Sequence, residues 1–298
     1  MKEILLLSGK GGTGKTTICA ALAALWKEPK VLADADVDAS NLPLLLAPRP
    51  VSRTPFFAGW EPVKEEEKCT GCGLCREKCR FGAIGEDLRI NPLDCEGCGV
   101  CAWFCPEKAL SMREKEVGEI FVSETPYGPL VHAELYPGEE NSGKLVVEVK
   151  RRARALAEEK GINFILIDGS PGVGCPVIAS LSGVSLCLLV AEPTVSGLHD
   201  FRRLAALLKH FRIPGYLIVN KADLAPELTE KLLELASIEG FVRLGSVPYD
   251  PEVFEALRAG RPLPEVSRGP ARKALLGISN RFHKIIFEEE NHEDRRSP

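Results

Sequence analysis

The stretch that decides the fold is GKGGTGKT, which runs from Gly9 to Thr16. It matches G-x-x-x-x-G-K-[ST], a pattern whose glycines let backbone N–H groups face phosphates while the lysine reaches the terminal ones. The apolar run Ile4–Leu7 before it predicts a strand, and Thr16–Trp26 after it has apolar residues at helical spacing. Because a strand before and a helix after are the context that this pattern needs, we expect a phosphate-binding loop.

Strands and helices alternate again in the second half of the chain. The segments NFILID, SLCLLVAE, YLIVNKAD and FVRLGSVP predict strands, and helical spacing covers about 197–211, 226–238 and 251–259. A basic helix is expected at about 143–160 and a closing helix at about 272–287. The alternation predicts an α/β fold with a doubly wound, mostly parallel sheet covered by helices on both faces.

The composition is that of a soluble globular protein. The chain has 298 residues, is 45% hydrophobic and carries a formal net charge of -4, which argues against general nucleic-acid binding. No apolar run reaches the ~18 residues of a membrane span, and the run of four at the start is too short for a signal-peptide core. The closing helix runs into Glu288, Glu289 and Glu290, which anionic lipid would repel. We expect a cytoplasmic protein without nucleic-acid or membrane partners.

A cysteine-rich block interrupts the α/β pattern between its second strand and the rest. Composition changes after Pro50, and cysteines follow at close spacing until about Met112. Because the α/β pattern resumes afterwards, the block is an insertion whose two ends are both attached to the larger domain. We predict a discontinuous nucleotide-binding domain at 1–60 and 116–298 and an inserted small α+β domain at 61–115, with a hairpin between Glu119 and Tyr136.

The cysteines repeat one spacing twice. One run reads C-x₂-C-x₂-C-x₃-C and the second repeats it before Pro106, which is the pattern of bacterial two-cluster ferredoxins. In that pattern the fourth cysteine of each run binds the other cluster. The pattern therefore implies one [4Fe–4S] cluster on Cys69, Cys72, Cys75 and Cys105, and a second on Cys95, Cys98, Cys101 and Cys79. Two Cys₄ zinc sites are the alternative. Arg80, where the first run would often have proline, is expected to raise its cluster's potential.

Acidic side chains follow two of the predicted strands. Asp168 ends the strand FILI, where a carboxylate beside the phosphate loop is expected to face magnesium. Asp34, Asp36 and Asp38 end the second strand, and a carboxylate there positions the attacking water or a water on the metal. We favour Asp36 over a merely solvated turn. The expected Mg²⁺ residues are Thr16, Asp36 and Asp168.

With Lys10, the stretch KGGTGKTT resembles the deviant phosphate loop of the MinD/ParA/nitrogenase-reductase class of P-loop ATPases, and DADVDASNL and DGSPGVG resemble its two switch regions. The resemblance implies that Lys10 reaches across a nucleotide-dependent homodimer, or a dimer with a paralogue, to the partner's phosphates, much as an arginine finger does. It also aligns Asp36 with the water-positioning acid and Asn41 with a switch residue. The expected catalytic residues are Lys10, Lys15 and Asp36.

The base-binding end of the site carries NKAD, Asn220 to Asp223, after the strand YLIV. This segment resembles the guanine-reading N-K-x-D of GTPases, whereas in the MinD-like class an asparagine here contacts adenine and a segment like Pro248–Asp250 packs near the base. Glu192 and Thr194 end another strand on the nucleotide side. We expect ATP with Mg²⁺, and GTP is the alternative. The expected nucleotide-binding residues are Gly9, Lys10, Gly11, Gly12, Thr13, Gly14, Lys15, Thr16, Thr17, Asp168, Asn220, Asp223 and Pro248.

Cys175 lies outside the two cysteine runs, in the second switch segment. The resemblance to nitrogenase reductase makes it a candidate ligand of a cluster held between two subunits. A dimer would supply only two such thiols, because no second cysteine lies between Met112 and Asn163. A half-buried loop cysteine is the alternative.

The combination resembles MinD-superfamily P-loop ATPases with an inserted ferredoxin domain. It implies an ATPase that couples nucleotide-driven dimer switching to electron transfer, or to maturation of a metallocentre or iron–sulfur cluster. Its partner would be a redox protein or a metalloprotein client. The alternatives are a ParA/MinD-type positioning or scaffolding ATPase with redox-sensing clusters, and an electron carrier on a degenerate scaffold.

Overall fold

The computed structural model describes residues 1–139 and 143–293, with the side chains of 288–293 left out. In chain order, its helices and strands are β1 (Lys2–Ser8), α1 (Lys15–Leu25), β2 (Val31–Ala35), α2 (Leu42–Leu46), β3 (Arg49–Lys64), η1 (Glu66–Lys68), α3 (Leu74–Lys78), α4 (Val100–Trp103), β4 (Leu110–Thr125), β5 (Gly128–Leu135), α5 (Lys144–Lys160), β6 (Phe164–Gly169), α6 (Cys175–Leu181), β7 (Leu186–Ala191), α7 (Val195–His210), β8 (Gly215–Asn220), α8 (Pro226–Ile238), β9 (Val242–Val247), α9 (Glu252–Arg258), α10 (Leu263–Val266) and α11 (Pro270–Glu293).

The chain forms two compact units. Unit 1 comprises Met1–Arg53, Ile120–Glu134 and Asn141–Pro298, and unit 2 comprises Thr54–Glu119 and Leu135–Glu140. Unit 2 thus begins before residue 61 and ends after residue 115, because the long strands β3 and β4 each belong partly to both units. Unit 2 lies within the chain of unit 1, between β2 and α5.

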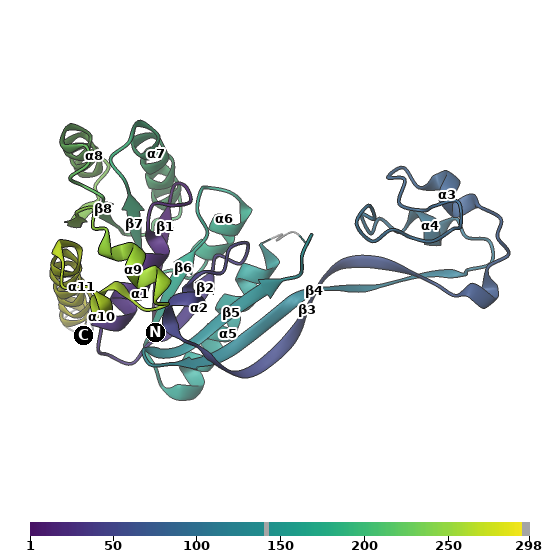
Figure 1. Ribbon diagram of the computed structural model, residues 1–298, viewed down its shortest axis with the longest axis horizontal. Helices are drawn as coiled ribbons and strands as arrows, with labels where there is room; N and C mark the ends of the chain where they lie inside the picture. The colour runs from purple at the N-terminus through teal and green to yellow at the C-terminus, as the bar shows by residue number, and fades with distance from the viewer. Residues whose placement is uncertain (140–142, 294–298) are drawn as a thin grey trace. The chain divides into compact units, whose positions relative to one another are not determined.

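Nine strands of the described residues form one sheet in the order β3-β4-β5-β2-β6-β1-β7-β8-β9 (Figure 1). From β5 to β9 every printed pairing is parallel, including β1 with β6 and with β7 and β2 with β6. The prediction of a mostly parallel α/β sheet is confirmed. The predicted hairpin is also present, as β4 and β5 joined at Pro126 and Tyr127.

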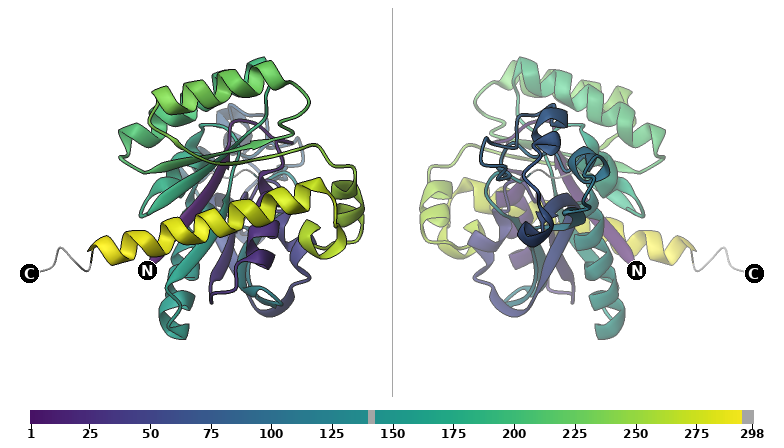
Figure 2. Two further views of the ribbon diagram at one scale, coloured as in Figure 1. Left: turned by 90° about the vertical axis from the view of Figure 1, so that its left-hand side faces the viewer. Right: turned by 90° about the vertical axis from the view of Figure 1, so that its right-hand side faces the viewer.

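Helices cover both faces of the unit 1 sheet because alternate strand residues point to opposite sides. On one face Leu6, Leu166 and Leu188 pack with apolar residues of α1, α2, α10 and α11 in one buried core. Helices α5, α6 and α7 contact the strands as well. Helix α11 runs along its face of the sheet (yellow in Figure 2), with Ile278 and Phe282 buried, so the closing helix packs in the core.

Unit 2 contains parts of β3 and β4, the short helices η1, α3 and α4, and the loops that join them. A small apolar cluster of Ile84, Cys101 and Leu110 is buried in it, and other cysteines pack against this cluster. Cys101 is therefore part of the interior of this unit, whereas Cys72 and Cys98 are exposed. That unit 2 is a ferredoxin-type domain stays a prediction.

Several features were not predicted from the sequence, among them the short helices α2, α6 and α10, strand β3 and the end of α11. Strand β3 extends over sixteen residues that are mostly exposed, so no alternation of apolar and polar side chains marks it. Helix α11 continues to Glu293, beyond the expected end at 287. Among the described residues, no helix is long and apolar enough to cross a membrane.

Candidate functional site

The phosphate loop lies between β1 and α1, at the carboxyl ends of the parallel strands, where open α/β sheets bind ligands. Gly14 caps the N-terminus of α1 with φ of 88°, in the left-handed region. A Cβ at Gly14 would stand 2.4 Å from Nδ2 of Asn220, so this position needs glycine for its conformation and for space. The loop therefore directs the N-terminus of α1 toward the adjoining cavity.

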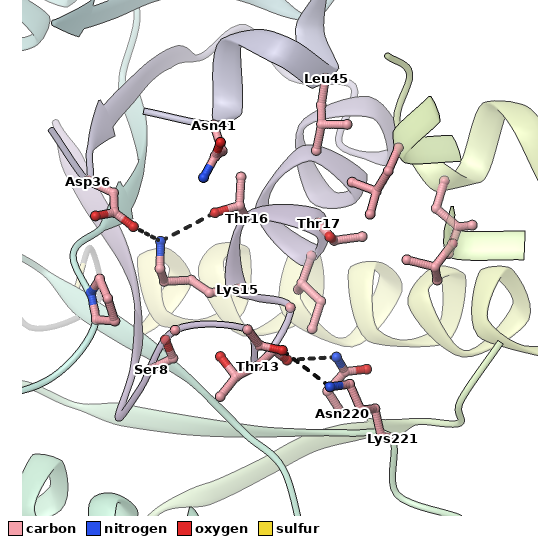
Figure 3. Close-up of a pocket in the computed structure, with 18 of the residues that line it drawn as sticks. Ser8, Thr13, Lys15, Thr16, Thr17, Asp36, Asn41, Leu45, Asn220 and Lys221 are labelled. Atoms are coloured by element: carbon pink, nitrogen blue, oxygen red, sulfur yellow. Dashed lines mark hydrogen bonds and ion pairs between the residues drawn. The ribbon is translucent and has the colours of Figure 1, made fainter. Parts of the chain in front are cut away.

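The cavity beside the loop has a volume of about 690 Å³ (Figure 3). Apolar side chains are part of its lining, with Phe254, Leu257 and Leu275 among them. Of the predicted nucleotide-binding residues, Gly9, Asp168 and Asp223 do not line it. Those that line it are Lys10, Gly11, Gly12, Thr13, Gly14, Lys15, Thr16, Thr17, Asn220 and Pro248, and Asp36, Asp38 and Asn41 join them.

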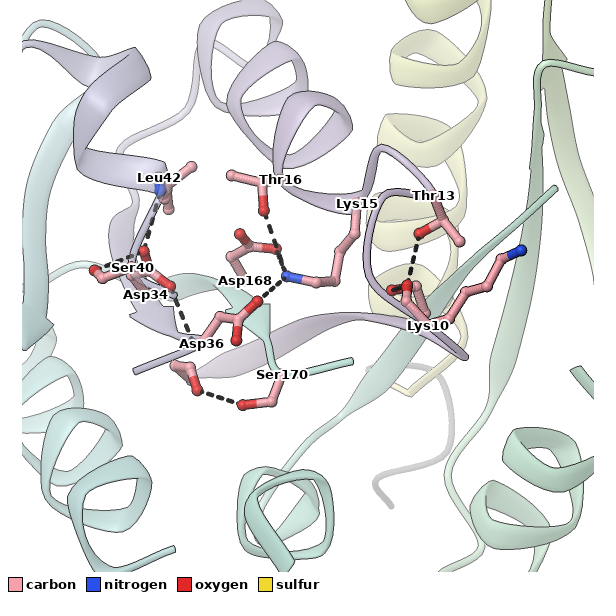
Figure 4. A network of polar contacts seen from close by, with 12 residues as sticks. Lys10, Thr13, Lys15, Thr16, Asp34, Asp36, Ser40, Leu42, Asp168 and Ser170 are labelled. Carbon is pink, nitrogen blue, oxygen red and sulfur yellow. Dashed lines mark hydrogen bonds and ion pairs between the residues drawn. The ribbon is translucent and has the colours of Figure 1, made fainter. Parts of the chain in front are cut away.

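Lys15 is buried against two carboxylates (Figure 4). Its Nζ lies 2.7 Å from Oδ1 of Asp168, 3.4 Å from Oδ2 of Asp36 and 3.5 Å from Oγ1 of Thr16. Burial lowers the pKa of the Lys15 ammonium, but the negative charges of Asp168 and Asp36 outweigh it, and the pKa lies above its usual value. The Lys15 side chain is therefore a positively charged group at the cavity beside the phosphate loop.

These residues suit a magnesium ion. Oδ2 of Asp168 is buried and has no hydrogen-bond partner among the described atoms, so a polar group is needed there. Mg²⁺ is bound by one or two carboxylates together with phosphates and waters. Burial also raises the pKa of Asp36. The ammonium of Lys15 thus lies among the three predicted magnesium residues, Thr16, Asp36 and Asp168. A bound phosphate would attract this ammonium away from the two carboxylates.

Asp34 has a structural position that the sequence did not distinguish from those of its neighbours. It is fully buried, and its carboxylate accepts hydrogen bonds from the Asp36 and Leu42 backbone N–H groups at 3.0 and 3.1 Å and from Ser40 Oγ at 2.9 Å. Burial and the negative charge of Asp168 raise the pKa of Asp34 to about 8. Asp34 therefore fixes the loop that presents Asp36 to the cavity.

Lys10 extends away from Lys15 (Figure 4). Its Nζ lies 2.6 Å from Oε1 of Glu192 and 3.1 Å from Oγ of Ser196, and its side chain is 38% exposed. The other oxygen of Glu192 lies 3.1 Å from Nζ of Lys221. The sequence places Glu192 and the NKAD segment near the site, but it gives no sign of Ser196 or of the contact between Glu192 and Lys221, because these contacts join three distant segments.

Side chains of the NKAD segment form hydrogen bonds to the backbone of the phosphate loop. Nδ2 of Asn220 donates a hydrogen bond to the Thr13 carbonyl at 2.7 Å, and Nζ of Lys221 donates to the Gly12 carbonyl at 3.2 Å. The Asp223 carboxylate accepts from the Tyr249 backbone N–H at 2.6 Å and lies outside the cavity lining. Asp223 thus holds the neighbouring loop in place.

The eight cysteines of the two runs surround two separate small cavities of unit 2. One cavity is lined by Cys69, Cys72, Cys75 and Cys105, and the other by Cys79, Cys95, Cys98 and Cys101. The fourth cysteine of each run therefore lies with the first three of the other run. This is the exchange that the ferredoxin spacing predicts.

The surroundings of these cysteines suit clusters ligated by thiolates. The N–H of Ala109 donates to Sγ of Cys105 at 3.3 Å, and the Lys64 ammonium interacts with Cys69. Donors and cations of this kind stabilise thiolate-bound iron. Gly71, Gly73, Gly97 and Gly99 all have positive φ, which allows the tight turns between the cysteines. Among the described residues, no group of three or more His, Cys, Asp or Glu side chains forms a site for a single metal ion.

The remaining cysteines lie apart from both sets. Cys175 is exposed at the start of α6. Cys19 and Cys187 are buried, and burial raises the pKa of both thiols. The structure therefore brings Cys175 to neither cysteine cavity.

A phosphate loop after the central β1 strand, with a buried lysine and strand-end carboxylates, defines a P-loop nucleotide-binding domain. Residues 4–263 match the model of the CobQ/CobB/MinD/ParA nucleotide binding domain. The chain belongs to this family.

Three proteins illustrate what the chain resembles. An uncharacterized protein of Methanocaldococcus jannaschii is 38% identical over 221 residues, which cover 74% of this chain and 78% of that protein. The cytosolic Fe-S cluster assembly factor NUBP2 of Rattus norvegicus is 25% identical over 304 residues, with 96% and 92% covered. The structure of the cell division ATPase MinD of Pyrococcus furiosus superposes with a TM-score of 0.59 at 22% identity, with 95% and 99% covered. The last likeness shows the fold alone.

Proposed function

We propose that the protein is an ATP-hydrolysing iron–sulfur protein that couples nucleotide-driven dimer switching to electron transfer or to maturation of a metallocentre or iron–sulfur cluster. The observation that carries the proposal is the sorting of eight cysteines into two sets of four, in a chain that also forms a phosphate-loop site. The name of the rat relative, an iron–sulfur cluster assembly factor, supports the same link.

Each residue of the phosphate site has a role in this proposal. Lys15 leaves the carboxylates and binds the terminal phosphates, and Thr16 and Asp168 hold Mg²⁺ directly or through water. The metal, when bound, neutralises charge that develops on the phosphates. Asp36, which lines the cavity, positions the attacking water. Lys10 acts on the phosphates of a second subunit, as the resemblance of its loop implies.

The cavity favours ATP over GTP in this proposal. Guanine reading by an N-K-x-D segment needs a carboxylate that faces the base, but Asp223 does not line the cavity. The lining includes apolar side chains, which suit the face of an adenine ring.

Coupling follows the path of the chain. The acids after β2 lead through α2 into β3, which continues into unit 2, and the chain returns from unit 2 to α5. Ordering of the first loop by a γ-phosphate is a known kind of switch. In the proposed function, this ordering changes the conformation of the segment from α2 to β3, from which the chain enters unit 2.

The test is an anaerobic purification followed by three measurements. We expect iron and sulfide near the ~8 of each that two [4Fe–4S] clusters need, and an EPR signal on reduction. We expect ATP turnover that Lys15→Ala abolishes. Stoichiometric zinc without iron, or turnover unaffected by Lys15→Ala, would contradict the proposal. A pull-down with and without a non-hydrolysable ATP analogue would then identify the client.

A further inference from the structure

Glu192 is a small ion-pair centre beside the phosphate loop. It follows β7 and is 9% exposed, and its two oxygens bind two different lysines, Lys10 at 2.6 Å and Lys221 at 3.1 Å. Burial opposes the charge, but the hydrogen bonds from both lysines lower the pKa of the Glu192 carboxyl. The carboxylate is therefore charged and fully engaged in this conformation.

The contacts hold Lys10 against its own chain. Besides Glu192, its ammonium donates to Ser196 Oγ, and that hydroxyl lies 3.1 Å from Thr194 Oγ1, which caps α7 by accepting the Gly197 N–H. Lys10 thus has a built docking position at the N-terminus of α7. In this position its ammonium pairs with a carboxylate of its own chain.

We propose that Glu192 is a latch that keeps Lys10 retracted in the monomer and releases it when the phosphates of a second subunit arrive. The inference rests on the proposed function, since it assumes that Lys10 acts across a dimer. Glu192 is then a positioning residue, because it acts on the reaction only through Lys10.

The second lysine lowers the free-energy cost of releasing the first. When Lys10 leaves, Lys221 remains on the other oxygen, so the nearly buried carboxylate is not left without a partner. Lys221 also donates to the Gly12 carbonyl, which links the latch to the loop that binds phosphate. The multiply charged phosphates of a nucleotide offer Lys10 stronger, charge-assisted bonds than a single carboxylate.

Only subunits whose Lys10 has left Glu192 are competent to form the dimer. The latch therefore weakens the dimer in proportion to the fraction of subunits in that released state. A partly exposed ion pair is worth up to about 1 kcal/mol, which corresponds to about a fivefold change in an equilibrium constant. Glu192→Gln keeps the shape and removes the charge. Because each of the two subunits releases one Lys10 on dimer formation, we expect the substitution to tighten the dimer up to about 25-fold.

The experiment measures the dimer dissociation constant by sedimentation with Mg²⁺ and a non-hydrolysable ATP analogue, in four proteins: wild type, Glu192→Gln, Lys10→Ala and the double variant. The latch predicts that Glu192→Gln tightens the dimer in the presence of Lys10 and has no effect in the Lys10→Ala background. Glu239→Gln, which removes the distant surface partner of Lys209, is the control and should match wild type. Unfolding temperatures check that each variant folds.

The outcomes separate the latch from the proposed function. If Lys10→Ala weakens the dimer but Glu192→Gln leaves it unchanged or weakens it, the latch is wrong and the role of Lys10 across the dimer stands. An equal effect of Glu192→Gln with and without Lys10 also overturns the latch, since a merely structural role would act in that way. If the wild type forms no analogue-dependent dimer, or Lys10→Ala has no effect on it, both proposals fail.

Discussion

Nζ of Lys15 lies 2.7 Å from Oδ1 of Asp168, and both side chains are almost completely buried. The ammonium of the phosphate loop is thus held by the strand-end carboxylate. A phosphate would have to compete with Asp168 for Lys15, and a bound Mg²⁺ would supply positive charge to Asp168 in place of Lys15. In the proposed function, the pair would therefore link phosphate binding to metal binding.

Breaking this pair from one side should cost much of the stability of the nucleotide-free protein. Lys15→Met leaves buried carboxylates without their counter-charge, and we expect a loss of about 3 kcal/mol in the free energy of unfolding by urea. Adding Asp168→Asn should recover more than half of that loss. Lys209→Met, at an exposed pair, is the control and should cost less than about 1 kcal/mol. Additive losses in the double variant would show that the two residues are not a unit.

The exchange of fourth cysteines makes a prediction about iron content. Cys105→Ser should disturb only the set with Cys69, and Cys79→Ser only the set with Cys95. In each variant we expect iron to fall from about eight to about four per chain, with one of two EPR signals lost. Cys175→Ser is the matched control and should retain all of the iron. Loss of the same signal in both variants would rule out the exchange.

The position of Asp223 predicts no role in choosing the base. Its carboxylate supports the Tyr249 N–H, so Asp223→Ala should leave the ratio of ATP to GTP affinity unchanged within about twofold by calorimetry. Asp223→Asn keeps an acceptor for that N–H and serves as the control. A tenfold loss of GTP binding relative to ATP in the alanine variant would instead identify Asp223 as a guanine reader.

His132 should make the protein less stable in mild acid. It is buried on β5 against Phe121, its Nε2 lies 3.2 Å from Ser123 Oγ, and burial lowers its pKa to about 4. Because the unfolded chain binds a proton near pH 6.5 and the folded one does not, stability is lost as pH falls below that value. Between pH 6.5 and 5 the loss is about 2 kcal/mol.

Urea unfolding at pH 7 and pH 5 checks this expectation. His132→Phe removes the titrating group and should reduce the difference in unfolding free energy between the two pH values by about 2 kcal/mol. His199→Gln, at an exposed histidine, should behave as wild type. The same difference between the two pH values in wild type and His132→Phe would assign the acid sensitivity to other groups.

The sequence predicted the parts of the fold that local pattern controls. The helix expected at about 226–238 coincides with α8, because an amphipathic helix repeats its apolar residues at fixed spacing. Strand β3 was missed because its stabilisation comes from backbone pairing with β4, which leaves no mark on exposed side chains.

In the site, motif spacing placed Lys15, Asp36 and Asn220 around one cavity, as expected from strands whose carboxyl ends share an edge. The roles of Asp34 and Glu192 could not be predicted. The burial of Asp34 depends on the packing of α2 above it, and the contacts of Glu192 join the ends of β1, β7 and β8. Such contacts depend on side-chain directions that only the folded chain fixes.

The central claim is that the nucleotide state controls the clusters. The most direct test measures the midpoint potentials of both clusters, by EPR-monitored redox titration of one anaerobic preparation, with Mg²⁺–ADP and with Mg²⁺ and a non-hydrolysable ATP analogue. We predict that at least one potential differs between the two nucleotide states, and that Lys15→Ala abolishes the difference. Equal potentials in both states, in a protein that binds both nucleotides, would contradict it.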